Sequence, residues 1–473
     1  MQYISTRGQA PKIDFCDVLL AGLARDGGLY VPETWPKLSE STDGATHASA
    51  KNSATASYAQ RAASIMTPFV GDEINQQVFE RLCVEAYSTF RHKDVAPLVE
   101  IAPNEYLLEL FHGPTLAFKD VALQLVGKLF DYVLTQRNER VMIIGATSGD
   151  TGGAAFDGVA SCRNVDMVML YPNNRVSDVQ RRQMTTLTAP NVHAVAVDGT
   201  FDDCQDLVKA MFNDQKFRDA NHLSAVNSIN WVRVMAQVVY YITAIEKLGR
   251  SAVFSVPTGN FGNVLAGWIA KQMGASVDGF VVASNTNDIL TRFFESKQMV
   301  ANEVVPTLSP SMDIQVSSNF ERLLFETNNR DGAETAKQLI SFRATGNLNI
   351  AASVYQKWIS GVFVGRRCND EQTLATMRDV YKQSAMLIDP HTAVGLYAAR
   401  QSAGVDYPKN MPMITLATAH PAKFPDAVRR ATGQTPKLPE HLADLMTRPE
   451  RSVSLPNDLK AVQAFVAGCR HSN

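Results

Sequence analysis

Short apolar segments alternate with segments of helical spacing along most of the chain. From about residue 104 onward, each apolar run is followed by a stretch whose apolar positions repeat as they do on one face of an α-helix. This alternation predicts parallel strands with helices covering both faces of a sheet, and therefore an α/β fold whose ligands bind in the loops at the carboxyl ends of the strands. Strands are expected at 106–111, 141–144, 167–170, 193–197, 253–256 and 280–283, and helices at 120–132, 178–186, 202–213, 232–245 and 264–273.

Residues 1–98 are predicted to form a subdomain of their own. Apolar residues recur at helical spacing over 13–23, and the following pair Gly27-Gly28 favours a helix stop and a turn. Another helix is expected over 69–88. The segment 39–60 is rich in Ser, Ala and Thr with few large apolar side chains, so we expect it to form an exposed loop or a mobile insertion.

Composition and charge exclude several classes of function. The chain has 473 residues, with 45 Lys and Arg against 47 Asp and Glu and a net charge of −2. A near-neutral chain without a basic block argues against nucleic acid or an anionic membrane surface as the main partner. No segment has the roughly 20 consecutive apolar residues of a membrane helix. The six cysteines are far apart without a CxxC pair, and the nine histidines lack metal-binding spacing. This pattern argues against a metal site or a disulfide framework, and favours thiols in a reducing cytoplasm.

The segment 111–120 (FHGPTLAFKD) joins a predicted strand to a predicted helix. Gly113 and Pro114 favour the turn, and Lys119 falls in the first helical turn. A lysine there is normally a solvated cation, but the positive end of the helix and the apolar neighbour Phe118 would lower its pKa. An uncharged lysine amine is a nucleophile of the kind that forms a Schiff base. By its position alone, Lys119 is either this nucleophile or a surface cation.

Two further loops are candidate anion sites. Residues 145–153 (GATSGDTGG) and 257–263 (PTGNFGN) each follow a predicted strand and open a predicted helix, where free backbone N–H groups gather. The first lacks the GxGxxG register of a dinucleotide loop, and a capped strand–helix turn is its alternative. The second lacks the Gly-Lys-Ser/Thr of a P-loop but suits a phosphate monoester dianion.

Two shorter motifs carry further polar groups. Asn227, Ser228 and Arg233 can donate several hydrogen bonds to a second anion, although a helix cap with an exposed arginine is the simpler interpretation. Thr418 places a hydroxyl at a strand end, where a local cap is more common. The chain thus offers one candidate nucleophilic lysine and two phosphate-sized cradles. One phosphate would belong to a cofactor and the other to a substrate.

Four motifs in this order resemble the threonine synthase family, pyridoxal-phosphate enzymes of fold type II. They are FHGPTLAFKD, TSGDTGGAA, PTGNFGN and ATAHPAKF. The segments 3–8 and 22–32, and Val176-Ser177 with Gln180 and Gln183-Met184, are similar to the long form of the family. The resemblance spans residue 3 to about residue 430. It implies two parallel-sheet α/β lobes plus an N-terminal subdomain, an architecture similar to that of the tryptophan synthase β subunit.

The resemblance also implies roles for individual residues. Lys119 corresponds to the catalytic Schiff-base lysine, and Thr418 to the hydroxyl expected at the pyridine nitrogen of the cofactor. The cofactor phosphate would be bound by Gly259, Asn260, Phe261, Gly262 and Asn263. The substrate α-carboxylate would be bound by Thr147, Ser148, Gly149, Asp150 and Thr151, and the substrate phosphate by Asn227, Ser228 and Arg233. No metal is implied.

The implied activity is the conversion of O-phospho-L-homoserine and water to L-threonine and phosphate, a β,γ-replacement that ends threonine biosynthesis. Lys119 would carry the α-proton, and the departing phosphate is one candidate for the β and γ proton transfers. The resemblance implies a large cofactor-binding lobe from 99–125 and 233–473, and a smaller inserted lobe, 126–232, which closes on the substrate. Two alternatives stay open: another lyase of the superfamily, such as an amino-acid dehydratase or phospho-lyase, and a non-catalytic binding protein on the same scaffold.

Overall fold

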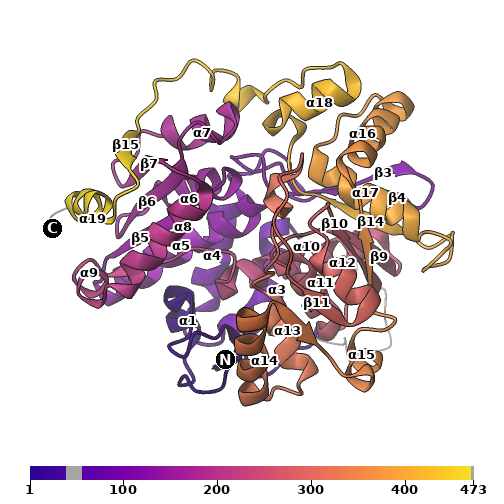
Figure 1. Ribbon diagram of the computed structural model, residues 1–473, viewed down its shortest axis with the longest axis horizontal. Coiled ribbons are helices and arrows are strands. Elements are labelled where there is room, and N and C mark those ends of the chain that lie inside the picture. Colours follow the sequence, from indigo (N-terminus) through magenta and orange to yellow (C-terminus); the bar gives the residue numbers. More distant parts are fainter. Residues whose placement is uncertain (39–55, 470–473) are drawn as a thin grey trace.

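The computed structural model describes residues 1–38 and 56–469 (Figure 1). Its N-terminal part pairs two short antiparallel strands and adds three helices. These elements are β1 (Tyr3–Ser5), α1 (Phe15–Ala21), β2 (Tyr30–Pro32), α3 (Tyr58–Val70) and α4 (Gln76–Tyr87).

Two expectations for this N-terminal part are wrong. The single helix expected over 69–88 is two helices, because the chain turns at Gly71 with φ 68° and restarts at Asn75, whose side chain caps α4. Residues 58–60, expected in a loop, open α3, since the preceding Ser57 forms a capping box. Residues 39–55 of the Ser/Ala-rich segment lie outside the described residues.

The larger sheet has six strands in the order β13-β10-β9-β14-β4-β3, all parallel except β3 against β4. The strands are β3 (Leu98–Ala102), β4 (Glu105–Glu109), β9 (Ala252–Pro257), β10 (Val277–Ser284), β13 (Phe363–Arg367) and β14 (Met413–Ala417). Helices of this part are α10 (Trp231–Leu248), α11 (Gly262–Met273), α12 (Ile289–Ser296), α16 (Asp370–Ser384), α17 (Pro390–Ser402) and α18 (Pro425–Thr432). A smaller unit between β10 and β13 contains β11 (Gln298–Val300), α13 (Phe320–Thr327), α14 (Gly332–Thr345), β12 (Asn347–Asn349) and α15 (Ala352–Trp358).

The second sheet has five parallel strands in the order β15-β7-β6-β5-β8. They are β5 (Val141–Ala146), β6 (Val165–Pro172), β7 (Val192–Asp198), β8 (Leu223–Ser224) and β15 (Val453–Pro456). Its helices are α5 (Lys119–Arg137), α6 (Asp150–Val159), α7 (Asp178–Thr185), α8 (Phe201–Asn213), α9 (Gln215–Ala220) and α19 (Leu459–Gly468). The expected α/β fold with two parallel-sheet lobes is therefore confirmed.

One part of the expected lobe division differs from the structure. The expected division places the tail of the chain in the large lobe, within 233–473, but β15 pairs in parallel with β7 of the second sheet. Helix α19 then packs its Val462 and Val466 into the apolar cluster of that sheet. Figure 1 shows this yellow segment beside the magenta strands of the other half. The pairing joins segments more than 250 residues apart, which local sequence patterns do not specify.

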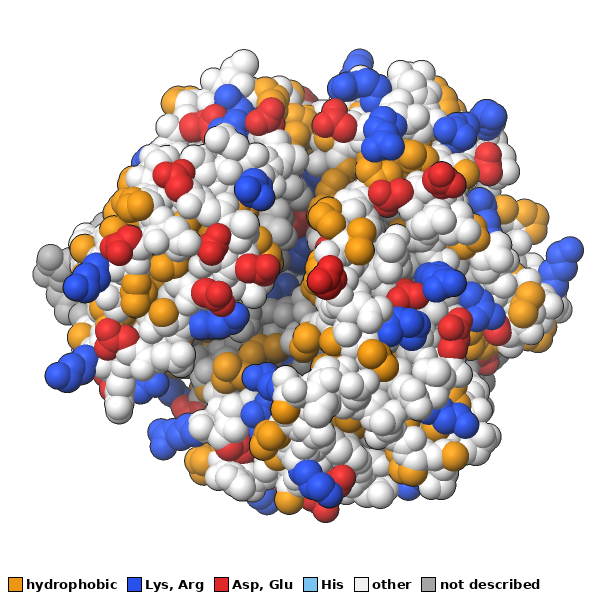
Figure 2. Space-filling view, viewed as in Figure 1, with side chains coloured by type: hydrophobic (Ala, Val, Ile, Leu, Met, Phe, Trp, Pro, Cys, Tyr) orange, Lys and Arg blue, Asp and Glu red, His pale blue; other side chains and the backbone are white. Residues whose placement is uncertain are grey.

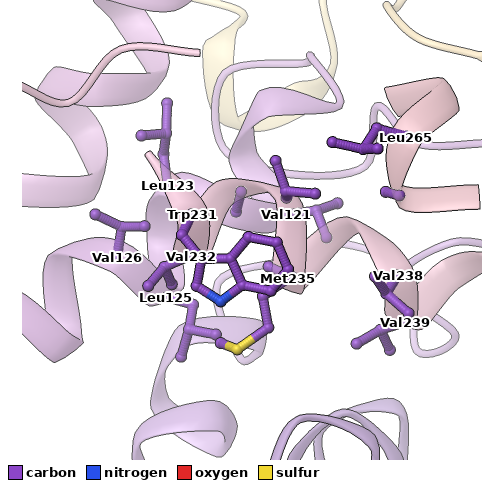
Figure 3. Close-up of a cluster of buried hydrophobic side chains, with 14 of the residues drawn as sticks. Val121, Leu123, Leu125, Val126, Trp231, Val232, Met235, Val238, Val239 and Leu265 are labelled. Carbon is purple, nitrogen blue, oxygen red and sulfur yellow. The ribbon is translucent and has the colours of Figure 1, made fainter. Parts of the chain in front are cut away.

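Helices α5 and α10 form the apolar centre of the molecule. Their side chains belong to one continuous buried cluster that also includes Leu265 of α11. Figure 3 shows Trp231 and Met235 of α10 among Val121 and Leu125 of α5. Because α5 is buried along most of its length, its first residue, Lys119, is held by a rigid element.

Helices α5 and α6 approach so closely that a methyl group would not fit between them. A Cβ built on Gly127 would lie 1.8 Å from the carbonyl oxygen of Gly158. We expect Gly127→Ala to lower the free energy of unfolding by about 1–3 kcal/mol through overpacking, as measured by urea denaturation. The matched control is Gly468→Ala in α19, where nothing lies within 4 Å and alanine is the better helix former. Equal stabilities of the two variants would contradict this account of the helix contact.

The described ranges contain neither a membrane-spanning helix nor a metal-binding cluster. None of the helices within 1–38 and 56–469 is both long and apolar enough to cross a membrane. The same ranges contain no group of three or more His, Cys, Asp or Glu side chains placed to bind a metal ion.

Candidate active site

The motif loops all follow carboxyl ends of parallel strands. Segment 111–118 follows β4, 258–261 follows β9 and 418–420 follows β14, three strands of the six-stranded sheet. Segment 147–149 follows β5 of the second sheet. Figure 2 shows a deep hollow between the two halves of the molecule, with Lys and Arg side chains on its walls. The topology therefore brings four sequence motifs to one region, as expected for α/β sheets.

Lys119 begins α5 and is only 9% exposed. The preceding residue is fixed to the end of β14, because the backbone N–H of Phe118 donates to the carbonyl of Thr418 at 2.9 Å. Burial lowers the pKa of the Lys119 amine, and Lys423 and Arg233 lower it further against the opposing effect of Asp150. The Asp150 contact is long, with 3.5 Å from Nζ to Oδ2, so we expect burial to dominate.

The turn before Lys119 is closed by Asp120. Its carboxylate accepts hydrogen bonds from the backbone N–H of Thr115 at 2.8 Å and from the Thr115 hydroxyl at 2.6 Å. Burial raises the pKa of Asp120 to about 7, although these hydrogen bonds oppose the shift. A Cβ on Gly113 would lie 2.5 Å from the Asp120 side chain, which explains the glycine at this point of the turn.

Asp150 is the polar centre of the site. Its carboxylate accepts from Gln180 Nε2 at 2.8 Å and from Ser311 Oγ at 3.2 Å, and forms an ion pair with Lys423 Nζ at 3.0 Å. Burial alone would raise the pKa of Asp150, but Lys423 and Lys119, with His391 and Gln180, hold it well below its usual range. A buried carboxylate is therefore kept charged beside a buried amine whose pKa is lowered.

The loop Gly259–Asn263 leads into the N-terminus of α11. Phe261 has φ 61°, and Gly262 starts the helix, so free N–H groups are available to an anion. The Asn263 Oδ1 accepts from the hydroxyls of Tyr240 at 2.5 Å and Tyr241 at 2.9 Å. Its Nδ2 is buried without a hydrogen-bond partner among the described residues. An unpaired buried donor beside a helix N-terminus suits a phosphate oxygen.

Arg233 is a buried cation, and two of its three guanidinium nitrogens have no hydrogen-bond partner among the described residues. It is 4% exposed, and within the described chain its Nε and Nη1 make no hydrogen bond. Burial lowers its pKa to about 10. Ser228, another candidate ligand of the substrate phosphate, lies against the loop Gly259–Asn263, because Asn319 Nδ2 donates to the carbonyls of both Ser228 and Asn260. Asn227 is exposed, and its side chain accepts from the Ile229 N–H at 3.2 Å.

The first anion loop is organised by its own threonine. The Thr147 hydroxyl accepts from the backbone N–H groups of Gly149 and Gly152, both at 3.0 Å. Thr147 therefore forms the capped turn that the sequence left open as an alternative. Ser148 is exposed and Asp150 is buried, so the two side chains of this loop face different environments.

Sequence reasoning missed several polar residues of the site. Ser311 contacts Asp150, Ser317 donates to the Gly259 carbonyl at 2.7 Å, and His391 Nε2 accepts from the Ser311 N–H at 3.2 Å. Isolated serines in a loop carry no local signal. Lys423 belongs to the motif ATAHPAKF. Its position just after a predicted strand end was the signal that could have indicated it as a site residue.

Three family models match the chain. The model of the threonine synthase N terminus matches residues 2–87, the model of pyridoxal-phosphate dependent enzymes matches 96–338, and the model of the threonine synthase C-terminal region matches 392–466. The chain is 52% identical to threonine synthase of Pseudomonas aeruginosa, covering 100% of this chain and 99% of the relative. It is 39% identical to threonine synthase of Saccharomyces cerevisiae, covering 94% and 93% of the two chains.

Solved structures agree with these relatives. The structure of pyridoxal-phosphate-bound threonine synthase from Brucella melitensis superposes with a TM-score of 0.94, at 49% identity and with 100% of both chains covered. Yeast threonine synthase superposes with a TM-score of 0.92, at 37% identity, covering 99% of this chain and 98% of the other.

Proposed function

Because the chain belongs to the threonine synthase family, we propose that it converts O-phospho-L-homoserine and water to L-threonine and phosphate in the region between its two sheets. One observation carries this proposal. The buried guanidinium of Arg233, whose Nε and Nη1 have no hydrogen-bond partner among the described residues, lies near enough to lower the pKa of a buried amine, Lys119. A substrate with a phosphate at one end and an amino acid at the other would satisfy both groups.

The residues of the site fit the family cofactor, pyridoxal phosphate. The unpaired Asn263 amide and the helix N-terminus at Gly262 suit its phosphate, and the Lys119 amine suits its aldehyde. Thr418 would face the ring nitrogen, where a hydroxyl does not enforce a positive charge. When bound, the cofactor withdraws electrons from the α-carbon of the substrate, which makes the α-proton removable.

The side chains then have separate tasks. Lys119 Nζ accepts the proton from the α-carbon and returns it at the end, which requires the amine to be uncharged when it acts. Arg233, with Ser228 and Asn227, binds the substrate phosphate, and the loop 147–151 binds the α-carboxylate. Two anion sites at opposite ends of one substrate fix its orientation, which lowers the entropic part of the barrier.

Arg233 also distinguishes this function from its nearest alternative. An amino-acid dehydratase of the same superfamily binds no substrate phosphate, so it has no need for a second buried cation. An unpaired buried charge is costly and is retained where a ligand compensates it.

The product assay is the direct test. The purified protein, supplied with O-phospho-L-homoserine, is expected to release phosphate and L-threonine in equal amounts. A coupled keto-acid assay with serine, threonine and phosphothreonine is the control and is expected to give no comparable turnover. Keto acid without threonine would overturn the proposal in favour of the dehydratase or phospho-lyase.

The reaction involves small molecules only, so we propose that the protein acts in the cytoplasm without nucleic acid or membrane as partner. All six cysteines are free thiols in the structure, which supports a reducing compartment. Cell fractionation followed by activity measurement tests this location.

A further inference from the structure

Lys423 is a second lysine of the site, and it is fully buried. It ends the short helical turn η2 (Pro421–Lys423) that follows β14, and its exposed fraction is 0%. Its Nζ lies 2.8 Å from the Thr115 carbonyl, 2.8 Å from Gln183 Oε1 and 3.0 Å from Asp150 Oδ1. Lys423 thus joins the turn before Lys119 to α6 and α7 of the other half.

The number of these contacts assigns the charge of Lys423. An ammonium group has three N–H donors, whereas an uncharged amine has two. All three neighbours of Lys423 Nζ are acceptors at ordinary hydrogen-bond distance, so the geometry requires the ammonium form. Lys119 Nζ differs, because its one polar contact in the described structure is the 3.5 Å approach to Asp150.

Two lysines therefore approach one buried carboxylate, and a buried guanidinium lies near one of them. Lys423 and Lys119 contact Asp150 directly, and Arg233 acts on Lys119 from nearby. One carboxylate can compensate one buried cation, and Lys423 has the closer position. A charged Lys119 would add a second uncompensated cation next to Arg233, so Lys119 is the group that loses its proton.

We propose that Lys423 is a positioning residue that acts through Asp150: by occupying this carboxylate, it prevents Asp150 from holding Lys119 as an ammonium. Lys423 does not itself touch the reacting atoms. The inference rests on the proposed function, because an uncharged Lys119 matters only if Lys119 is the nucleophile. It gives a role to the lysine of the fourth motif, to which the sequence assigned none.

Other charged groups face this arrangement from the surrounding elements. His391 of α17 influences Asp150, its Nδ1 lies 2.8 Å from Asp389 Oδ2, and its Nε2 lies 3.2 Å from the backbone nitrogen of Ser311. Asp120 of α5 is influenced by Lys423. The groups that act on the charge of Lys119 are thus Asp150, Lys423 and Arg233, and Asp150 is influenced in turn by His391.

The test measures the charge of Lys119 without measuring turnover. The full-length protein is freed of its cofactor and mixed with pyridoxal phosphate at different pH values, and the rate of formation of the yellow bound form is recorded. Borohydride reduction and peptide mass mapping then locate the adduct at Lys119. Because only the uncharged amine reacts, the pH at which the rate is half-maximal, called the midpoint below, reports the pKa of Lys119.

Lys423→Met is expected to move this midpoint upward by about one pH unit, which slows uptake about tenfold below the midpoint. Lys423→Gln keeps hydrogen-bond donors but has no charge, so it is expected to move the midpoint in the same direction. It serves as the test variant if Lys423→Met does not fold. Lys423→Arg keeps the charge and is expected to leave the midpoint near that of the wild type. The double variant Lys423→Met/Asp150→Asn removes both charges and is expected to move the midpoint back.

The outcomes separate this inference from the proposed function. A wild-type protein that forms no adduct at Lys119 would overturn the proposed function. If the wild type reacts at Lys119 but a folded Lys423→Gln or Lys423→Met variant has an unchanged midpoint, the proposed role of Lys423 is overturned. The proposed function would then still stand. A double variant that stays shifted would also overturn the role of Lys423, because the effect would then not pass through Asp150.

Discussion

Lys119→Ala is expected to abolish turnover and the yellow colour of the bound cofactor together. The side chain begins α5, and burial lowers the pKa of its amine. Removing a group that binds the cofactor covalently and carries the α-proton is expected to lower kcat by about a thousandfold or more. The measurement is threonine formation, with an absorption spectrum of the same protein.

Two controls accompany this variant. Lys128→Ala removes another lysine from the same helix, whose Nζ contacts Ser161 Oγ at 3.3 Å, and is expected to retain both colour and activity. Lys119→Arg keeps a positive charge but not a nucleophilic amine, so it is expected to be as inactive as the alanine variant. Threonine formation by either Lys119 variant would reject the role of this residue.

Arg233→Leu is expected to weaken substrate binding and to stabilise the protein without ligand. Two guanidinium nitrogens, Nε and Nη1, are buried without a hydrogen-bond partner in the described structure, so their desolvation is not compensated until an anion binds. We expect kcat/KM for O-phospho-L-homoserine to fall about 100-fold, mainly through KM, because a buried charge pair with the substrate is lost. Without ligand, the midpoint of thermal unfolding of the variant should lie above that of the wild type. Inorganic phosphate should raise the midpoint of the wild type but not that of the variant.

Arg322→Leu provides the matched control. Arg322 is equally buried, but its guanidinium donates to the carbonyls of Tyr30 at 2.9 Å and Ile229 at 2.7 Å and to Asn319. Its loss leaves buried acceptors unpaired and is expected to lower stability by about 3 kcal/mol. If Arg233→Leu were destabilising like Arg322→Leu, Arg233 would be a structural residue and the substrate phosphate would bind elsewhere.

The sequence by itself determined the local elements and the chemistry of the motif loops. Strands at 141–144 and 253–256, and the helix at 120–132, could be predicted because apolar periodicity reflects the geometry of a single segment. The motifs at their ends indicated the cofactor and the family, both of which are confirmed. The assignment of individual ligands, such as Asn263 to the cofactor phosphate, stays a prediction.

Only the tertiary structure decided how the site is charged and closed. Lys423 forms an ion pair with Asp150, although the two residues are 273 positions apart in the sequence (423 − 150). Strand β15 likewise pairs with the distant strand β7. These contacts between residues far apart in the sequence shift pKa values, because burial removes the water that would otherwise screen each charge. Periodicity along a chain describes which residues share a face, whereas the free energy of a charge depends on everything packed around it.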